Sequence, residues 1–360
     1  MKRHKTRQIK VGGVKIGGGA PVSIQSMTKV ETSDVRAAVA QINRLETVGC
    51  EIIRVAVKSF DDARAIRDIK RKIKIPLVAD IHFNYRLAIE SINSGADKIR
   101  LNPGNIGKRN DIEAVIRAAK KEKIPIRIGV NSGSVVSPPR QAQETGRGSH
   151  KAGNLSSELA DAVSSYIKLL EEEDFYDIII SLKASDVATT IEAYRSMSGV
   201  CSYPLHLGVT ASGSYDSGVI KSAIGIGSLL ADGIGDTIRV SLTADPVEEV
   251  IAAKRILSAV GTRHFGPEVI SCPTCGRCQV DLGEIVRRLE KELSTARYSL
   301  IANRGVTIAV MGCEVNGPGE AKEADIGIAF GKNSGMLFKK GKKIKKVETK
   351  NAIKELLKII

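Results

Sequence analysis

The sequence predicts an α/β protein in which a (β/α)₈ barrel is followed by a small α/β domain. The first observation is a rhythm, because short β-branched runs alternate eight times with longer segments of helical spacing. The second observation is that this rhythm stops after Gly261. The third is a cluster of cysteines beyond that point, which indicates a second domain with chemistry of its own.

The eight strand-like runs account for the first domain. Strands that alternate with helices form a parallel sheet, and eight such units over about 250 residues fit a closed barrel better than an open sheet. The segments 33–47 and 156–170 are examples of the intervening helices, with apolar residues at every third or fourth position. The expected strands are Pro21–Met27, Glu51–Val57, Pro76–Ile81, Asp97–Leu101, Pro125–Val130, Tyr176–Leu182, Pro204–Val209 and Thr237–Leu242.

The boundary between the domains is expected at a linker that runs from Gly261 to Pro267. We therefore expect a barrel domain at 1–262 and a second domain at 267–360. The second domain should contain a helix at 282–294, strands at 306–311 and 325–329, a lysine-rich hairpin and a closing helix at 351–359. The hairpin includes the run from Lys339 to Lys346, which is interpreted as a solvated surface or as a docking site for an acidic redox protein.

Polar residues collect where each barrel strand ends. Barrel enzymes place their sites at the carboxyl ends of the strands, so these side chains should converge on one mouth. Five cations at one level would favour a polyanion, most simply a diphosphate. For any single arginine the alternative is a structural ion pair with Asp80, Asp97 or Asp236. The residues are Gln25, Ser26, Arg54, Asp80, His82, Arg100, Asn102, Asn105, Arg127, Asn131, Lys183, Ser185, His206, Thr210, Arg239 and Ser241.

The two histidines of this set are interpreted differently. His82 is assigned to the site, whereas His206 is interpreted as a core residue. The pair Gly225 and Gly227 opens no dinucleotide fingerprint, which argues against a nicotinamide site. The segment from Ser132 to Asn154 is long for a barrel connection, and such loops are often lids or disordered.

Composition narrows the range of partners. The formal net charge of +15 suits an anionic partner, but aromatic residues make up only 4% of the chain and there is no Trp, so a nucleic-acid partner is disfavoured. The first residues lack the apolar stretch of a secretory signal, and no run of about 18 apolar residues occurs, so we expect a cytoplasmic protein without membrane segments. The isolated Cys50 and Cys201 are interpreted as core residues.

The clustered cysteines predict a metal centre. Cys272, Cys275 and Cys278 are closely spaced, and Cys313 is followed seven residues later by Glu320. A structural zinc ribbon would normally have a second Cys-x-x-Cys pair, which Cys313 lacks, so an iron-sulfur cluster is favoured. Its fourth ligand is either Cys278, which gives a closed electron-transfer centre, or Glu320, which leaves one iron with an exchangeable oxygen ligand.

Several motifs together identify a family. Nearly the whole chain resembles the bacterial hydroxymethylbutenyl diphosphate synthases, and the cysteine and Asn-Gly-Pro-Gly-Glu strings are the specific part of the resemblance. The strings are Gln25-Ser-Met27, Val78-Ala-Asp-Ile-His-Phe83, Ile99-Arg-Leu-Asn-Pro-Gly-Asn-Ile-Gly107, Arg127-Ile-Gly-Val-Asn-Ser-Gly133, Gly235-Asp-Thr-Ile-Arg-Val-Ser241, Cys272-Pro-Thr-Cys-Gly-Arg277 and Val315-Asn-Gly-Pro-Gly-Glu320.

The resemblance implies an activity and a cofactor. Such enzymes reductively open 2-C-methyl-D-erythritol 2,4-cyclodiphosphate to 4-hydroxy-3-methylbut-2-enyl diphosphate in isoprenoid precursor biosynthesis, with two electrons from flavodoxin or ferredoxin. It also implies a homodimer. The ligands of a [4Fe-4S] cluster would be Cys272, Cys275, Cys313 and Glu320, with Cys278 as a neighbour. Diphosphate contacts would be Arg54, Arg100, Arg127 and Lys183, with Asn102, Asn131 and His82 beside them and Arg239 as a further cation.

The chain departs from the family pattern at one position. Where many members have Thr-Glu-Ala-Gly after the seventh strand, this chain has Thr210-Ala-Ser-Gly213. In the family that glutamate is proposed to handle protons, and Ala211 cannot do so. Either the role passes to a neighbour such as His82 or Asp232, or the glutamate is not essential here. The expected catalytic residues are Glu320, as the exchangeable ligand of the cluster, and His82, as the candidate for proton transfer.

Overall fold

The chain divides into two compact units. The computed structural model describes residues 2–102, 106, 108–131, 152–210, 212–293, 305–315 and 317–359 of the 360. The first unit is Met1–Thr262 and the second is Arg263–Ile360. Each is described by itself below.

The first unit is the predicted barrel. Its strands pair in parallel in the order β8-β7-β6-β5-β4-β3-β10-β9. A parallel bridge between Ile180 and Leu205 joins β8 to the chain entering β9 and so brings the two ends of the sheet together. The (β/α)₈ prediction is confirmed, although the last two strands are shorter than expected. The strands are β3 (Ser23–Met27), β4 (Ile52–Val57), β5 (Leu77–Ile81), β6 (Lys98–Leu101), β7 (Ile126–Asn131), β8 (Ile178–Lys183), β9 (His206–Leu207) and β10 (Thr237–Ile238).

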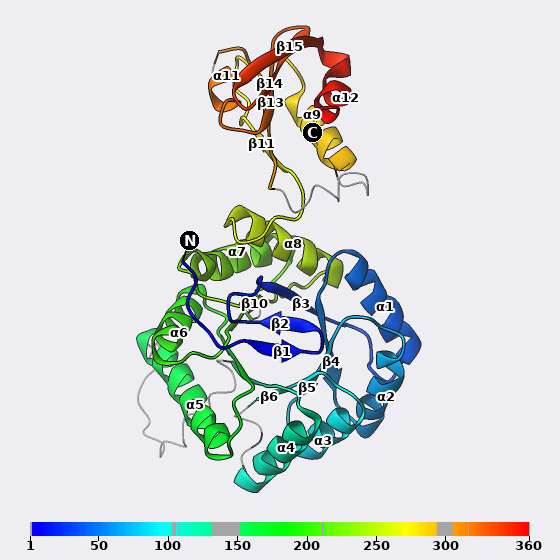
Figure 1. Cartoon of the computed structure of the whole chain (residues 1–360), viewed down its shortest axis with the longest axis vertical. Coiled ribbons are helices and arrows are strands. Elements are labelled where there is room, and N and C mark those ends of the chain that lie inside the picture. The colour runs from blue at the N-terminus through cyan, green and yellow to red at the C-terminus, as the bar shows by residue number, and fades with distance from the viewer. Residues whose placement is uncertain are drawn as a thin grey trace, which may run out of the picture. The chain divides into compact units, whose positions relative to one another are not determined.

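Helices surround the strands as an outer ring (Figure 1). Each turns an apolar stripe inward: on α1 the buried residues are Ala38, Ile42 and Leu45, spaced by three or four positions. Polar residues cap the N-termini of several of these helices. One example is Ser59 before α2, which forms a capping box with Asp62. The helices are α1 (Val35–Thr47), α2 (Phe60–Lys70), α3 (Tyr85–Asn93), α4 (Arg109–Glu122), α5 (Ala152–Glu172), α6 (Val187–Val200), α7 (Tyr215–Ala231) and α8 (Pro246–Ala259).

An N-terminal hairpin, which the sequence analysis missed, covers the amino-terminal end of the barrel. Its strands are β1 (Ile9–Val11) and β2 (Val14–Ile16). The apolar side chains of the hairpin pack on Ile52, Val78 and Ile179, which lie inside the barrel. Gly12 in the turn has a φ of +54°, and a Cβ there would lie 3.0 Å from Pro76, so glycine allows the hairpin to approach the strands closely. The opposite, carboxyl end of the barrel is where the strand-end residues gather.

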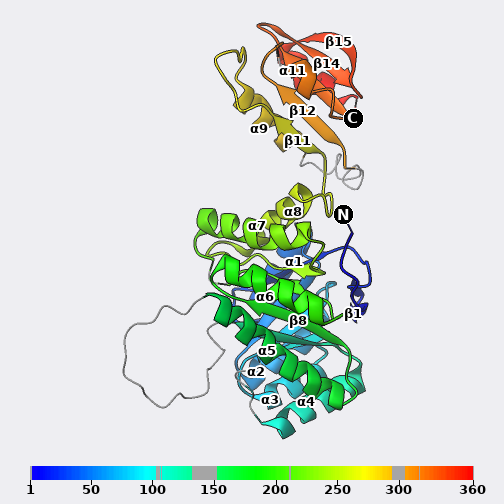
Figure 2. The ribbon, with the colours of Figure 1, turned by 90° about the vertical axis from the view of Figure 1, so that its left-hand side faces the viewer.

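The second unit is a five-stranded sheet with α9 and α12 on one face and α11 on the other. Leu282 and Leu289 of α9 and Leu356 of α12 pack against one side of the sheet. Ala309, Met311 and Phe338 lie in a separate apolar cluster. Figure 2 shows α9 and α11 with this sheet. The strand order is β11-β12-β13-β14-β15. The elements are β11 (Glu268–Ser271), α9 (Leu282–Leu293), β12 (Thr307–Met311), α11 (Gly317–Glu320), β13 (Ile326–Phe330), β14 (Ser334–Lys339), β15 (Lys342–Glu348), η4 (Thr349–Asn351) and α12 (Ala352–Leu357).

The predicted elements of the second unit are present, and β11 is an addition to them. Strand β15 is the edge strand of the sheet and carries most of the lysine-rich run. Lysines on an edge strand discourage pairing with another chain, which gives this run a structural explanation. Lys345 pairs with Glu355 of α12, and Lys339 Nζ donates to the carbonyl oxygen of Ile359.

Some expectations fall outside the described residues. Of the long loop expected from Ser132 to Asn154, residues 132–151 lie outside them, and α5 already begins at Ala152. The same holds for Asn105, Ala211 and Ser294. Within the described part of the chain, none of the helices combines the length and the apolar character that a membrane span requires.

Candidate active site

Most of the predicted strand-end residues of the barrel surround one cavity of about 240 Å³, whereas Gln25, Ser26, Ser185 and His206 are not in its lining. The five predicted cations line it together with His82 and Asn131. Asn102 is buried directly after β6 but is not among the lining residues. The lining residues are Met27, Arg54, Asp80, His82, Arg100, Arg127, Asn131, Ser181, Lys183, Thr210, Arg239 and Ser241.

The strand register brings these side chains to one level. In the strand register, Asp80 of β5 lies opposite Arg100 of β6, and Arg100 lies opposite Arg127 of β7. These three adjacent strands therefore present charged residues at matching positions. Alternate residues of a strand share a face, which also sets Asn131 two positions beyond Gly129 on the face of Arg127. The barrel interior is therefore charged at the mouth and mostly apolar near the hairpin, where Lys98 is a buried exception opposite Val78.

Two glycines that the sequence analysis missed make room for the cations. A Cβ at Gly129 would lie 2.6 Å from Arg100 Nε, and a Cβ at Gly208 would lie 2.8 Å from Lys183 Nζ. Neither glycine has a positive φ, so each is required by space and not by backbone conformation. Both glycines are visible in the sequence, in the strings Arg127-Ile-Gly and Leu207-Gly, but only the structure shows which cation each one faces.

Asp80 is the carboxylate at the centre of the cavity wall. Arg100 Nη1 donates to its Oδ1 at 3.1 Å, and Arg54 Nε lies 3.6 Å from its Oδ2. Burial alone would raise the pKa of Asp80, but Arg54, the contact with His82, and Arg100 outweigh it and hold the pKa well below its usual range. Of the ion pairs considered from sequence, those with Asp80 are present, whereas Asp97 pairs with Lys70 and Asp236 with Arg3.

The remaining cations face one another more than they face carboxylates. Burial, followed by repulsion from neighbouring arginines, lowers the pKa of Arg127 and of Lys183 well below their ordinary values. The Nε–H groups of Arg100, Arg127 and Arg239 are buried without a hydrogen-bond partner among the described residues. An anion that entered the cavity would relieve this repulsion and accept these unused hydrogen bonds.

The two histidines lie in different surroundings. The His82 side chain is about half exposed, and its Nε2 is 3.6 Å from Asp80 Oδ2 and 3.5 Å from Arg100 Nη1. His206 is fully buried, and neither of its ring nitrogens has a hydrogen-bond partner among the described residues. Burial and the nearby Arg127 lower the pKa of His206 far enough to keep it neutral, as expected for a core histidine.

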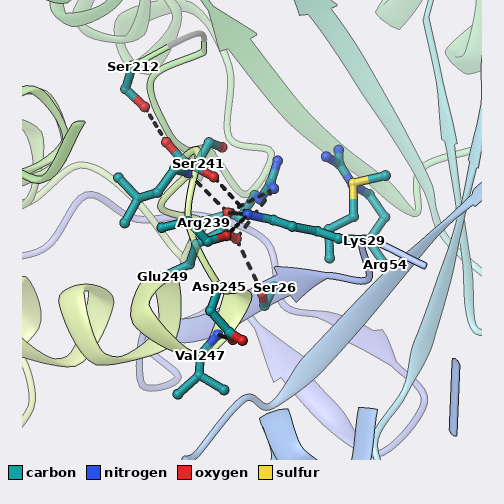
Figure 3. A network of polar contacts seen from close by, with 12 residues as sticks. Ser26, Lys29, Arg54, Ser212, Arg239, Ser241, Asp245, Val247 and Glu249 are labelled. Atoms are coloured by element: carbon teal, nitrogen blue, oxygen red, sulfur yellow. Dashed lines mark hydrogen bonds and ion pairs between the residues drawn. The ribbon is translucent and has the colours of Figure 1, made fainter. Parts of the chain in front are cut away.

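A network beside the cavity was also missed by the sequence analysis. Figure 3 shows Glu249 of α8 among Lys29, Arg239 and Ser26. Glu249 is 1% exposed although it is charged. The sequence places it on the first turns of a helix, where acidic residues are common, so nothing in the pattern distinguishes it from the neighbouring Glu248.

The second unit has a separate cavity of about 250 Å³ lined by thiols. Cys272 follows the end of β11, and Cys313 follows the end of the neighbouring parallel strand β12. Carboxyl ends of parallel strands meet at one edge, which brings residues 41 positions apart together. The backbone N–H of Gly312 donates to Cys272 Sγ at 3.3 Å. The lining residues are Cys272, Pro273, Thr274, Cys275, Arg277, Met311, Gly312, Cys313, Gly317 and Glu320.

Cys278 lies beside this cavity but not in its lining. It is not among the lining residues, its Sγ donates to the carbonyl oxygen of Val280 at 3.3 Å, and it packs against the apolar core below α9. A Cβ on Gly312 would lie 2.4 Å from Cys278 Sγ, so the thiol is enclosed on that side. Among the described residues, no three His, Cys, Asp or Glu side chains converge closely enough to hold a single metal ion.

These observations define a class of protein: a (β/α)₈ barrel enzyme whose mouth is built for a small polyanion, joined to a separate module with a thiol-lined cavity. Family comparison agrees with both parts. The model described as "GcpE TIM-barrel domain" matches residues 6–254, and the one described as "GcpE protein C-terminal domain" matches residues 268–360. The chain therefore belongs to the GcpE family.

Curated relatives and solved structures give two levels of similarity. The 4-hydroxy-3-methylbut-2-en-1-yl diphosphate synthase (flavodoxin) of Clostridium perfringens is 53% identical over 360 residues, covering 100% of this chain and 99% of that protein. The enzyme of the same name from Thermodesulfovibrio yellowstonii is 51% identical over 357 residues, covering 99% and 98%. These relatives confirm the family predicted from the motifs.

A dihydropteroate synthase from Stenotrophomonas maltophilia is similar in fold alone. It has a TM-score of 0.51 at 16% identity, covering 71% of this chain and 98% of that chain.

Proposed function

We propose that this chain catalyses the reductive ring opening of 2-C-methyl-D-erythritol 2,4-cyclodiphosphate to 4-hydroxy-3-methylbut-2-enyl diphosphate, a step of isoprenoid precursor biosynthesis. The reaction takes up two electrons and two protons and releases one water. The single observation that carries the proposal is the cavity at the barrel mouth, where Arg54, Arg100, Arg127, Lys183 and Arg239 surround a volume of about 240 Å³. The names of the relatives at 51–53% identity support the same reaction.

In this proposal the cations bind the diphosphate. The Nε–H groups of Arg100, Arg127 and Arg239, which have no partner among the described residues, would donate hydrogen bonds to phosphate oxygens. The Asp80 carboxylate fixes the Arg100 guanidinium from the other side, so that little side-chain freedom remains to be lost on binding. Asn131, which lines the cavity, and Asn102, which is buried directly after β6, would position the remaining oxygens of the substrate.

The thiol cavity fits an iron-sulfur cluster as cofactor. We propose that Cys272, Cys275, Cys313 and Glu320 hold a [4Fe-4S] cluster, because they line one cavity while Cys278 lies outside it. The donor set combines soft thiolates with one harder oxygen, and the Gly312 N–H already donates to one sulfur. When bound, the cluster would supply the two electrons singly and offer an exchangeable iron position to a substrate oxygen. Glu320 is exposed, and can therefore move away from that position.

His82 is the residue that we propose for proton transfer at the barrel mouth. It lines the cavity, is half exposed and contacts Asp80. Asp232, the alternative considered from sequence, is at the end of α7, where it pairs with Arg195 of α6, and it does not line the cavity. A histidine beside a carboxylate can donate a proton to the leaving hydroxyl group and be recharged from solvent.

The electron donor and the quaternary state are part of the proposal. Flavodoxin is in the printed names of the relatives, and we propose flavodoxin or ferredoxin as the donor to this chain. The family resemblance supports a homodimer, and the absence of an apolar span among the described helices is compatible with a cytoplasmic enzyme.

An anaerobic experiment tests the function. We expect the reconstituted protein to be brown, with about four irons and four sulfides per chain, and to convert the cyclodiphosphate when a chemical reductant is supplied. A colourless protein that contains zinc and no sulfide would overturn the proposal, as would a loaded cluster without turnover.

A matched pair of variants tests the ligand assignment. Glu320→Ala should keep most of its iron, because three thiolates remain, but should lose most of its turnover. Cys278→Ala should keep both, because its thiol lies outside the cavity. Iron analysis and the anaerobic assay measure the two effects. The assignment is wrong when the Cys278 variant loses the cluster and the Glu320 variant turns over normally.

A further inference from the structure

Glu249 is a buried carboxylate next to the barrel cavity whose position the proposed reaction does not explain. It lies on α8 and is 1% exposed. A buried carboxylate is costly unless it is paired and hydrogen-bonded. Its partners come from two segments of the barrel that are far apart in the sequence, residues 26–29 and 239–242, so it does more than begin a helix.

The contacts of Glu249 connect the cavity wall to the helix layer. Its Oε1 accepts the backbone N–H of Leu242 at 3.0 Å and lies 3.2 Å from Lys29 Nζ. Its Oε2 lies 3.4 Å from Arg239 Nη2 and 3.4 Å from Ser26 Oγ. Figure 3 shows the carboxylate between Lys29 and Arg239.

Arg239 is the point at which this network reaches the cavity. One terminal nitrogen of its guanidinium faces Glu249, whereas its Nε is buried without a hydrogen-bond partner among the described residues. The bond to the Leu242 N–H fixes the backbone immediately after Ser241, and Ser241 also lines the cavity. Glu249 therefore acts on two cavity residues without lining the cavity itself.

We propose that Glu249 is a positioning residue that holds Arg239 and the Ser241 backbone in the geometry that binds the anionic group of the substrate. The inference rests on the proposed function for the identity of the substrate, but the contacts of Glu249 would affect the binding of any anion in this cavity. Without an acceptor at Glu249, the other carboxylate that acts on Arg239 is Asp80, which already pairs with Arg54 and Arg100. Arg239 would then be displaced and the anion would lose one of its donors.

The isosteric variant Glu249→Gln tests this proposal. A glutamine side chain keeps the shape of the glutamate, but its NH₂ group is a donor and would face another donor on Lys29, Arg239 or Leu242. We expect the Kd for inorganic pyrophosphate, measured by calorimetry, and the KM for the cyclodiphosphate each to rise about tenfold, with kcat changed less than about twofold. Glu248→Gln is the matched control, since Glu248 is one residue away on the same helix and does not face the cavity.

A double-mutant cycle tests whether the effect passes through Arg239. In an Arg239→Gln background, Glu249→Gln should change the pyrophosphate Kd by less than about twofold, because the group that it positions is already gone. Glu249→Asp keeps the charge but shortens the side chain. It should fall between the wild type and the Gln variant, and it replaces the Gln variant if that protein does not fold.

Rescue by the conservative variant gives a readout that a purely structural role would not change. Charged groups around Arg239 are Arg54 of β4, Asp80 of β5, Lys183 of β8, Lys29 after β3 and Glu249 itself. An arginine stays protonated at working pH, so Glu249 acts by holding the guanidinium and not by setting its charge. Glu249→Asp, which keeps a carboxylate, should therefore recover part of the pyrophosphate affinity that Glu249→Gln loses, measured by calorimetry between about pH 7 and 8, and Glu248→Gln should match the wild type.

The outcomes separate this inference from the proposed function. If the wild type, loaded with its cluster, fails to convert the cyclodiphosphate, the proposed function is wrong, and the pyrophosphate measurements still test Glu249. If the wild type turns over but Glu249→Gln binds both anions as tightly as the wild type or more tightly, the inference is wrong. An effect confined to kcat, or one that persists in the Arg239→Gln background, would also overturn it.

Discussion

The two cavities of this protein follow the same topological rule but differ in how firmly the chain holds their functional groups. Both lie at carboxyl ends of parallel strands. In the barrel, Arg127 is 1% and Lys183 is 6% exposed. In the second unit, Cys275 and Glu320 are exposed and Cys272 is half-buried. The barrel therefore fixes the side chains of its cavity by packing, whereas Cys275 and Glu320 are held less firmly, and the cluster proposed for the thiol cavity would order them on binding.

This difference has a consequence for the electrostatics of the two sites. The barrel confines several cations with few carboxylates, and the energy of that arrangement is supplied by the folding of the whole unit. The thiol cavity contains no comparable group of buried like charges before a cofactor binds. Changes in the barrel should thus act on anion affinity, and changes in the second unit should act on cofactor content and turnover.

The largest effect is expected for removal of a buried thiol. Cys313→Ser should abolish stable cluster incorporation and reduce turnover by at least about a thousandfold, because a hydroxyl is a much poorer ligand for iron than a thiolate. The pyrophosphate Kd of the barrel should stay within about twofold of the wild type. Iron and sulfide analysis and calorimetry measure the two quantities. A large loss of pyrophosphate binding in this variant would contradict the separation of the two sites.

The next effect concerns a single cation in the barrel. Arg127→Met should weaken pyrophosphate binding about a hundredfold, which corresponds to about 2.7 kcal/mol, while iron content after reconstitution is unchanged. The aliphatic side chain fills most of the volume, so collapse of the barrel is limited. Arg117→Met, on the exposed side of α4, is the control for loss of one positive charge. Equal weakening in both variants would show that net charge, and not the cavity, binds the anion.

A smaller effect is expected from loss of space beside a cation. Gly129→Ala would place a Cβ 2.6 Å from Arg100 Nε and should push the guanidinium away from Asp80. We expect the pyrophosphate Kd to rise about tenfold. Gly199→Ala on α6 is the control, because its Cβ would meet no atom within 4 Å. Calorimetry on both variants decides the question, and an unchanged Kd for Gly129→Ala would mean that Arg100 has room to adjust.

The sequence was sufficient for the barrel, because eight alternating runs with cations at their ends determine both the strands and the mouth. It could also have revealed the hairpin, since Ile9, Val11, Val14 and Ile16 alternate around Gly12-Gly13. Glu249 is different. Glu248 and Glu249 look alike in the sequence, and only the way α8 packs against β3 turns one of them inward. The position of Cys278 outside the lining of the thiol cavity is likewise a tertiary property that spacing does not encode.

The smallest effect is the pH dependence of stability that Asp80 contributes. The folded-state pKa of Asp80 is depressed, so its stabilisation is fully present above its unfolded pKa of about 4 and is lost as pH falls through the folded value. Between about pH 5 and 8 the carboxylate is ionised in both states, and the difference in unfolding free energy between wild type and Asp80→Asn should be constant. From about pH 4.5 to 3 that difference should shrink by about 1 kcal/mol, because the unfolded wild-type chain takes up a proton that the folded chain does not. Urea denaturation of both proteins across this range measures it. A difference that stays constant to pH 3 would mean that the cations around Asp80 do not depress its pKa, and the barrel mouth would then be less strongly cationic than the packing indicates.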